Sequence, residues 1–142
     1  MSDDSSTSPE PDADLLDLWA RVFAMARAGQ TETLMAYVDA GISANLTNDK
    51  GDSLIMLAAY HGHSHTVSAL VARGGDPNRL NDRAQSPLAG AVFKTETEVI
   101  HTLLAGGADP LVGQPSAIET ARMFNREDLL ALFAQVSTNS SE

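Results

Sequence analysis

The chain repeats itself with a period of 33 residues. The segment from Asn48 reads Asn-Asp-Lys-Gly-Asp-Ser-Leu-Ile-Met-Leu-Ala-Ala, and the segment from Asn81 reads Asn-Asp-Arg-Ala-Gln-Ser-Pro-Leu-Ala-Gly-Ala-Val. A fixed period of this length is typical of one supersecondary unit stacked on copies of itself. Such an array presents a long surface built from equivalent positions and offers no obvious place for catalysis.

The same register extends toward both ends of the chain. Counting back one period places Ala26 under Ala59 and Gly41 under Gly74, and counting forward from Ala91 reaches Ala121 after a spacing shorter by three residues. The register predicts units at about 14–47, 48–80, 81–113 and 114–136, with the first and last units acting as caps. Residues 1–13, rich in Ser, Pro and Asp, are expected to be a disordered acidic tail, and residues 137–142 a frayed C-terminal tail.

Local signals within the units predict helices. Apolar residues between Leu15 and Ala26 recur at spacings of three and four, which places them on one face of a helix. Ser116 and Glu119 have the spacing of a capping box. Glycines end three other helical runs, where a left-handed residue belongs: Gly41, Gly74 and Gly107. No segment alternates apolar and polar residues long enough to suggest a sheet, so the sequence predicts an all-α solenoid of helix-turn-helix units.

The repeat resembles the ankyrin family. The family pattern runs from a Gly through Thr-Pro-Leu-His-x-Ala-Ala and Gly-His to Val-x-x-Leu-Leu-x-x-Gly-Ala-Asp-x-Asn. The first full copy matches or nearly matches it at Gly51, Ser53, Ile55, Ala58, Ala59, Gly62, His63, Val67, Leu70, Gly74, Asp76 and Asn78, and the next at Ser86, Pro87, Leu88, Ala91, Leu103, Leu104, Gly107, Ala108 and Asp109. The departures are Leu54 for the usual Pro, Met56 and Ala89 for the usual His, and Thr95 for the usual Gly.

The resemblance implies where a partner would bind. In the ankyrin fold the ends of the inner helices and the short β-turn fingers face a concave groove that contacts partners. The residues at those positions are Arg27, Asp49, Lys50, Asp52, Tyr60, His61, Asp82, Arg83, Gln85, Phe93, Lys94 and Met123. Aromatic, Arg and Met side chains are enriched at interfaces. Tyr60 and Phe93 are expected to stand side by side, and the alternative that their rings only pack between units stays open.

Composition narrows the function further. The formal net charge is −10, and no basic stripe is present, so the chain is a poor candidate for binding nucleic acid. Its acidic tail fits either a solubilising role or attraction to a basic partner. No apolar run is long enough to span a membrane. The absence of cysteine excludes disulfides and thiolate metal sites, and no motif for a cofactor or for catalysis is found.

The run His61-Gly-His63-Ser-His65 raises the question of a metal site. Side chains two residues apart on a helix point to different sides, so they cannot share one ion, and no metal site is predicted. In the resembled family the His63 position supports the turn. A pH-sensitive surface at His61 is the other open interpretation.

The sequence therefore predicts a non-enzymatic protein–protein interaction module that binds one partner protein, of unknown identity, through the groove and fingers. The alternative is a non-selective, chaperone-like or structural accessory protein. We expect the chain to be cytoplasmic and to be monomeric when alone. An excess of Arg over Lys, seven to two, together with abundant Ala, favours a bacterial source.

Overall fold

A computed structural model describes residues 13–140, so the acidic tail expected at 1–13 lies outside the described residues except for its last residue. The described part contains eight α-helices and two isolated β-bridges. The helices are α1 (Ala13–Ala28), α2 (Thr31–Asp39), α3 (Leu54–Tyr60), α4 (Ser64–Ala72), α5 (Pro87–Phe93), α6 (Thr97–Ala105), α7 (Ala117–Met123) and α8 (Glu127–Ser140). The predicted all-α fold of helix pairs is confirmed.

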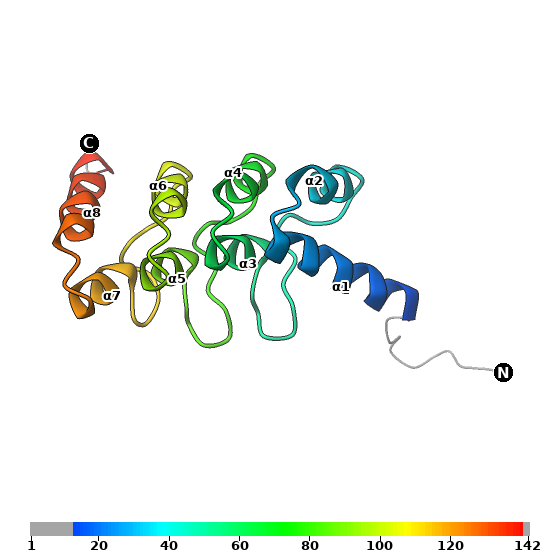
Figure 1. Ribbon diagram of the computed structural model, residues 1–142, viewed down its shortest axis with the longest axis horizontal. Coiled ribbons are helices and arrows are strands. Elements are labelled where there is room, and N and C mark those ends of the chain that lie inside the picture. The colour runs from blue at the N-terminus through cyan, green and yellow to red at the C-terminus, as the bar shows by residue number, and fades with distance from the viewer. Residues whose placement is uncertain (1–12, 141–142) are drawn as a thin grey trace.

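The helices form two layers along one axis (Figure 1). The inner layer consists of α1, α3, α5 and α7, each packed against the next, and α2, α4 and α6 follow one another in the outer layer. Each inner helix also packs against the outer helix that follows it in the chain. Between units the chain extends beyond the inner helices as loops, which are called fingers here: residues 47–53, 80–86 and 112–116.

Three inner helices begin with the same cap. The hydroxyls of Ser53, Ser86 and Ser116 accept hydrogen bonds from the backbone N–H three residues later. These contacts satisfy N–H groups that the first helical turn leaves without a partner. At α7 the Glu119 carboxylate also accepts from the Ser116 N–H at 2.8 Å, which confirms the predicted capping box.

Left-handed residues recur after the outer helices and at the corners between the inner and outer helices. Gly41, Gly74 and Gly107 follow the outer helices with φ of 127°, 93° and 100°, as predicted. The corner between the inner and outer helix is formed by Gly29, Gly62, Thr95 and Asn125, with φ of 72°, 83°, 55° and 55°. The third corner therefore holds a β-branched residue in a conformation that such residues avoid.

Replacing Thr95 by glycine should stabilise the fold by about 1 kcal/mol. Relief of left-handed strain at a non-glycine residue, worth about 1–3 kcal/mol, outweighs the greater unfolded-state entropy of glycine, worth about 0.4–1 kcal/mol. Urea unfolding monitored by circular dichroism measures the change. Asn125→Gly is the matched control, and its effect should be close to zero because Asn tolerates this conformation. An equal gain for both variants would show that Thr95 is not strained.

The core lies between the two layers. Large side chains at equivalent positions in successive units are fully buried, among them Leu34, Val67 and Ile100, and also Leu70, Leu103 and Phe133. The inner helices approach one another over small residues that are also fully buried: Ala26, Ala58, Ala59, Ala91 and Ala121. Because alanine side chains are small, the inner helices lie close together. The larger side chains that follow these alanines in the sequence project out of the inner layer.

Asparagine side chains connect successive units. Asn45 donates to the Gly74 carbonyl at 3.0 Å and accepts from the Asp76 N–H at 2.7 Å. Asn78 makes the same two contacts one period later, with the Gly107 carbonyl and the Asp109 N–H. Leu111 occupies the next equivalent position and lies 68% exposed. The asparagine contacts thus fix the spacing of the first three units.

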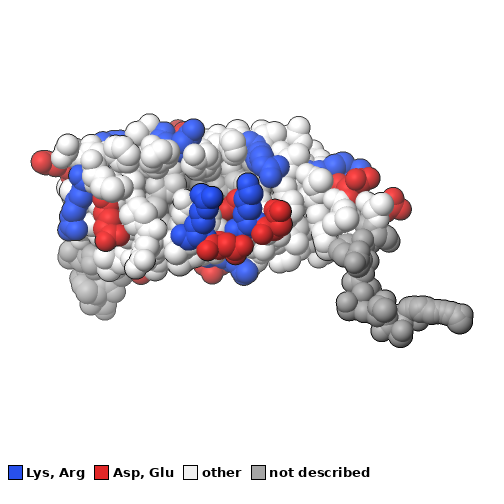
Figure 2. Space-filling model, turned by 90° about the horizontal axis from the view of Figure 1, so that it is seen from below, with Lys and Arg blue, Asp and Glu red and all other residues white. Residues whose placement is uncertain are grey.

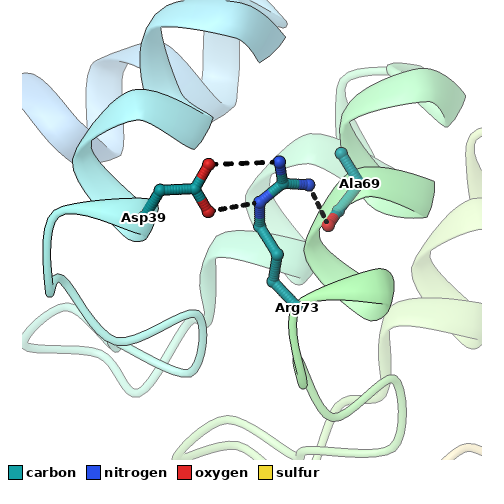
Figure 3. A network of polar contacts seen from close by, with 3 residues as sticks. All are labelled: Asp39, Ala69 and Arg73. Atoms are coloured by element: carbon teal, nitrogen blue, oxygen red, sulfur yellow. Dashed lines mark hydrogen bonds and ion pairs between the residues drawn. The ribbon is translucent and has the colours of Figure 1, made fainter.

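An ion pair adds a contact between α2 and α4 that does not repeat (Figure 3). Arg73 donates to both carboxylate oxygens of Asp39, at 2.8 and 3.3 Å, and to the Ala69 carbonyl at 3.3 Å. The guanidinium lowers the pKa of the Asp39 carboxyl below its usual value. Both groups are exposed, so the expected contribution to stability is modest.

The last helix runs into the segment predicted to be a C-terminal tail. That tail was placed at residues 137–142, and α8 extends through Ser140. Helix propagation adds a hydrogen bond for each residue fixed once a nucleus exists, so polar residues of moderate propensity extend a formed helix. Residues 141 and 142 lie outside the described part of the chain.

Candidate partner-binding groove

A hollow of about 310 Å³ opens between the inner helices and the fingers. Its lining is mainly apolar and comes from α3, α5, α7 and the fingers that precede α5 and α7. The lining residues are Met56, Tyr60, Gln85, Ser86, Pro87, Ala89, Gly90, Phe93, Pro115, Thr120 and Met123. The volume is at the lower end of the range of about 300–1,000 Å³ for ligand pockets, so the hollow suits one or two apolar side chains.

Large apolar side chains at equivalent helix positions surround this hollow while facing solvent. Tyr60, Phe93 and Met123 are 40%, 57% and 61% exposed, although they end helices whose other apolar residues are buried or partly buried. The Phe93 ring meets the Phe124 ring edge-on with centroids 5.8 Å apart. The Tyr60 ring meets His61 in the same way at 5.7 Å. Tyr60 and Phe93 thus line one hollow from successive helices, and each keeps a large open surface.

Three basic side chains lie at the corner ends of the inner helices. Arg27 is in the last turn of α1, and His61 and Lys94 are the residues that follow α3 and α5. The Lys94 ammonium lies 4.9 Å from the centre of the Tyr60 ring, within the range of a cation–π contact. These three residues are called the basic row below, and its Lys94 end meets the apolar hollow at the Tyr60 ring.

The electrostatic environment lowers the pKa of His61 below its usual value. Burial opposes the charged imidazolium most, and the positive charges of His63, Arg27 and Lys94 oppose it further, while Glu96 acts in the opposite direction. His61 is therefore more often neutral near physiological pH than a free histidine is.

The free energy of unfolding should decrease as the pH is lowered below about 6.5, because His61 is harder to protonate in the folded protein than in the unfolded chain. Because the folded-state pKa is lowered, the unfolded chain binds this proton more readily, so the free energy of unfolding decreases as pH falls from the unfolded pKa toward the folded one. Above that window the contribution is constant. Urea unfolding of the wild type and of His61→Gln between about pH 8 and pH 5 checks this, and identical pH dependence in the two proteins would contradict it.

His63 has a structural role. Its Nε2 lies 2.8 Å from the Arg27 carbonyl oxygen, and its ring covers Gly29, where an added Cβ would clash with it. His63 therefore joins the corners of the first two units.

Across residues 13–140, no three His, Cys, Asp or Glu side chains gather in a way that could hold a metal ion.

Finger residues are held by hydrogen bonds. The Asn48 side-chain oxygen accepts from Lys50 and Asp52 N–H groups, and the Asn81 oxygen accepts from Arg83 and Gln85 N–H groups. The Asn81 amide also donates to the side chains of Asp52 at 2.8 Å and Gln85 at 2.7 Å. Adjacent fingers are linked backbone to backbone, from the Asp82 N–H to the Lys50 carbonyl.

Of the finger residues predicted as contacts, all are exposed except Asp52, which is partly buried. Asp52 and Gln85 also accept hydrogen bonds from the Asn81 amide. Figure 2 views the molecule from below the fingers and shows acidic and basic side chains interleaved near its middle, with uncharged surface on both sides. The finger face is thus charged but mixed in sign, and a partner would meet no uniform field there.

The structure also adds lining residues that the repeat pattern did not select, among them Met56, Ala89, Pro115 and Thr120. A signal existed for the first two, because they stand where the resembled family usually has His. The apolar replacements make this stretch of the groove more hydrophobic than the family pattern implies. Nothing in the repeat pointed to Pro115, which lies within the shortened connection between α6 and α7.

Comparison with known proteins agrees with this architecture. A family model described as ankyrin repeats (3 copies) matches residues 22–113, more than half of the chain. The protein named "Putative ankyrin repeat protein PA3287" from Pseudomonas aeruginosa is 41% identical over 56 residues, which cover 39% of this chain and 33% of the relative. The matched segment thus spans about a third of that relative. The relative is bacterial, and the composition of this chain favours a bacterial source as well. Among the helices of residues 13–140, none combines the length and hydropathy of a membrane span. The chain belongs to the ankyrin repeat family.

Proposed function

We propose that this protein is a non-enzymatic interaction module that binds a partner protein through its concave groove and fingers. Ankyrin repeats are in general protein–protein interaction modules. The observation that carries the assignment to the groove is the alignment of Tyr60, Phe93 and Met123, exposed side chains that surround one apolar hollow. Exposed apolar clusters with a polar rim mark interaction sites, and aromatic and Met side chains are enriched there.

The lining of the hollow supports binding over catalysis. It contains no His, Asp, Glu, Lys or Arg side chain, and the hydroxyls of Ser86 and Thr120 are engaged within the fold, which leaves Tyr60 as its one titratable side chain. Ser86 accepts from the Ala89 N–H as a helix cap, and Thr120 donates to the Ser116 carbonyl at 2.8 Å. General acid–base or nucleophilic chemistry needs a titratable group within reach of the substrate. The ankyrin family is also typically non-enzymatic.

Affinity capture from a native lysate with quantitative mass spectrometry tests the proposal. The full chain should retain one partner in a stoichiometric amount, and Phe93→Asp should lose it. Leu111→Asp is the matched control because that leucine is exposed outside the groove, and this variant should retain the partner. A broad set of clients, retained equally by all three proteins, would instead favour a chaperone-like accessory role. Light scattering of the purified chain should show a monomer.

A further inference from the structure

The basic row stands out in a chain whose formal net charge is −10. Outside the row, only Arg73 and Arg126 form ion pairs among residues 13–140, with Asp39 and Asp128, so the row differs from the remaining basic side chains by its place at the groove corner. Within residues 13–140, the side chains of Arg27 and Lys94 form no ion pair. Positive charge at the groove corner is therefore left open to a ligand, although the surrounding protein is acidic.

The charges around the row come from several elements. His61 lies between Arg27 and Lys94, and His63, directly before α4, is also close to it. Glu96, at the start of α6, is the acid that acts on His61, and its carboxylate lies next to Gly62. One carboxylate thus faces two permanent cations and a titratable imidazole. The local field stays positive, and it becomes more positive when His61 is protonated.

The row and the hollow share a border. Lys94 lies over the ring of Tyr60, and the same ring lines the hollow beside Phe93. A peptide that places an apolar side chain in the hollow therefore has its neighbouring residues within reach of the cations. Because like charges that meet across an interface repel each other, this border selects against a basic flank.

Accepting the proposed groove function, on which this step rests, we infer that the partner presents an acidic segment whose Asp or Glu residues flank a large apolar side chain. The apolar side chain fills the hollow between α3, α5 and α7, and the carboxylates lie along Arg27, His61 and Lys94. Helix C-termini attract cations in any protein, so the row also serves the helices. Its border with an open apolar hollow is what makes it a recognition surface.

Selection from a random peptide library displayed on phage tests the inference and does not require an identified partner. The full chain should enrich peptides with Asp or Glu beside Leu, Met or an aromatic residue, and Phe93→Asp should enrich none of them. A labelled peptide from that set is then titrated against four proteins by fluorescence anisotropy. These are the wild type, Arg27→Ala combined with Lys94→Ala, His61→Gln, and the control Arg79→Ala, whose side chain is exposed in the turn after α4.

The double variant should weaken binding about ten-fold, whereas Arg79→Ala should leave it unchanged. Lowering the pH from about 8 to about 5.5 should strengthen binding to the wild type but not to His61→Gln, because the peptide carboxylates stay ionised over this range. Circular dichroism of each variant excludes unfolding as the cause.

Several results would overturn the inference, and they differ from failure of the groove itself. Groove-dependent peptides that are neutral or basic would refute the acidic segment while leaving the proposed function intact. If the selection yielded no peptide whose binding depends on Phe93, that result would count against the proposed function. Residues 1–12 of this chain carry Asp3, Asp4, Glu10 and Asp12 and are the competing occupant. If a synthetic peptide of residues 1–12 displaced the label as well as the unlabelled selected peptide does, the row would be assigned to that segment.

Discussion

Leu88→Ala should lower the free energy of unfolding by about 2–5 kcal/mol. Leu88 is 1% exposed in α5, at the centre of the array, and belongs to the continuous apolar core. Truncating the side chain removes buried apolar surface and leaves a cavity. The neighbouring units cannot fill this cavity without losing contacts with each other. Because each unit of a repeat array is supported only by its neighbours, loss of packing in a central unit also weakens the coupling between the two ends.

Urea unfolding measures the change, and hydrogen exchange shows where it acts. The matched control is Leu111→Ala, the same chemical change at a position 68% exposed, and its effect should stay within about 0.5 kcal/mol. Exchange in Leu88→Ala should rise in α7 and α8 as well as in α5. Equal costs for the two leucines, or an effect confined to α5, would contradict the stacked packing described above.

Phe93→Asp should weaken binding of the captured partner by at least about 100-fold, the range of an interface hot spot. The Phe93 ring is 57% exposed, lines the apolar hollow and meets Phe124 edge-on, so it combines open apolar surface with a fixed orientation. Asp at this position places a charge in an apolar site that a partner would have to desolvate. The folded state should lose less than about 1 kcal/mol, because little of this ring contributes to the core.

Titration of the purified partner by calorimetry checks the affinity, with Leu111→Asp as the control that adds the same charge outside the groove. Undiminished binding to Phe93→Asp would place the interface elsewhere on the array. Reduced binding by both variants to the same extent would point to added negative charge as the cause rather than the position.

The sequence predicted the parts of the fold that repeat. Ser116 with Glu119 marked a helix start because a capping box needs two residue types at a fixed local spacing, and Gly74 and Gly107 marked helix ends because a left-handed residue there favours glycine. Contacts that occur only once in the array could not be predicted from the sequence repeat. The ion pair of Asp39 with Arg73 has no counterpart in the next unit, since Gly106 replaces the arginine.

In the groove, too, the features that repeat were predicted and the contacts that occur once were not. Register alone placed Tyr60 and Phe93 at equivalent positions, and both line one hollow in the structure. Register did not reveal that the Asp52 side chain is engaged by Asn81, because that contact joins two fingers through rotamers that a linear pattern does not encode. The open surface of the aromatic rings is likewise a property of the packed array.

The most direct test of the account is the double variant Tyr60→Ala with Phe93→Ala, measured for partner affinity and for helicity in the same preparation. If the rings form a docking surface, binding is lost while the far-ultraviolet circular dichroism spectrum and the unfolding midpoint stay close to those of the wild type. If the spectrum shows a large loss of helix, the rings hold the units together, and the assignment of this groove to partner binding is wrong.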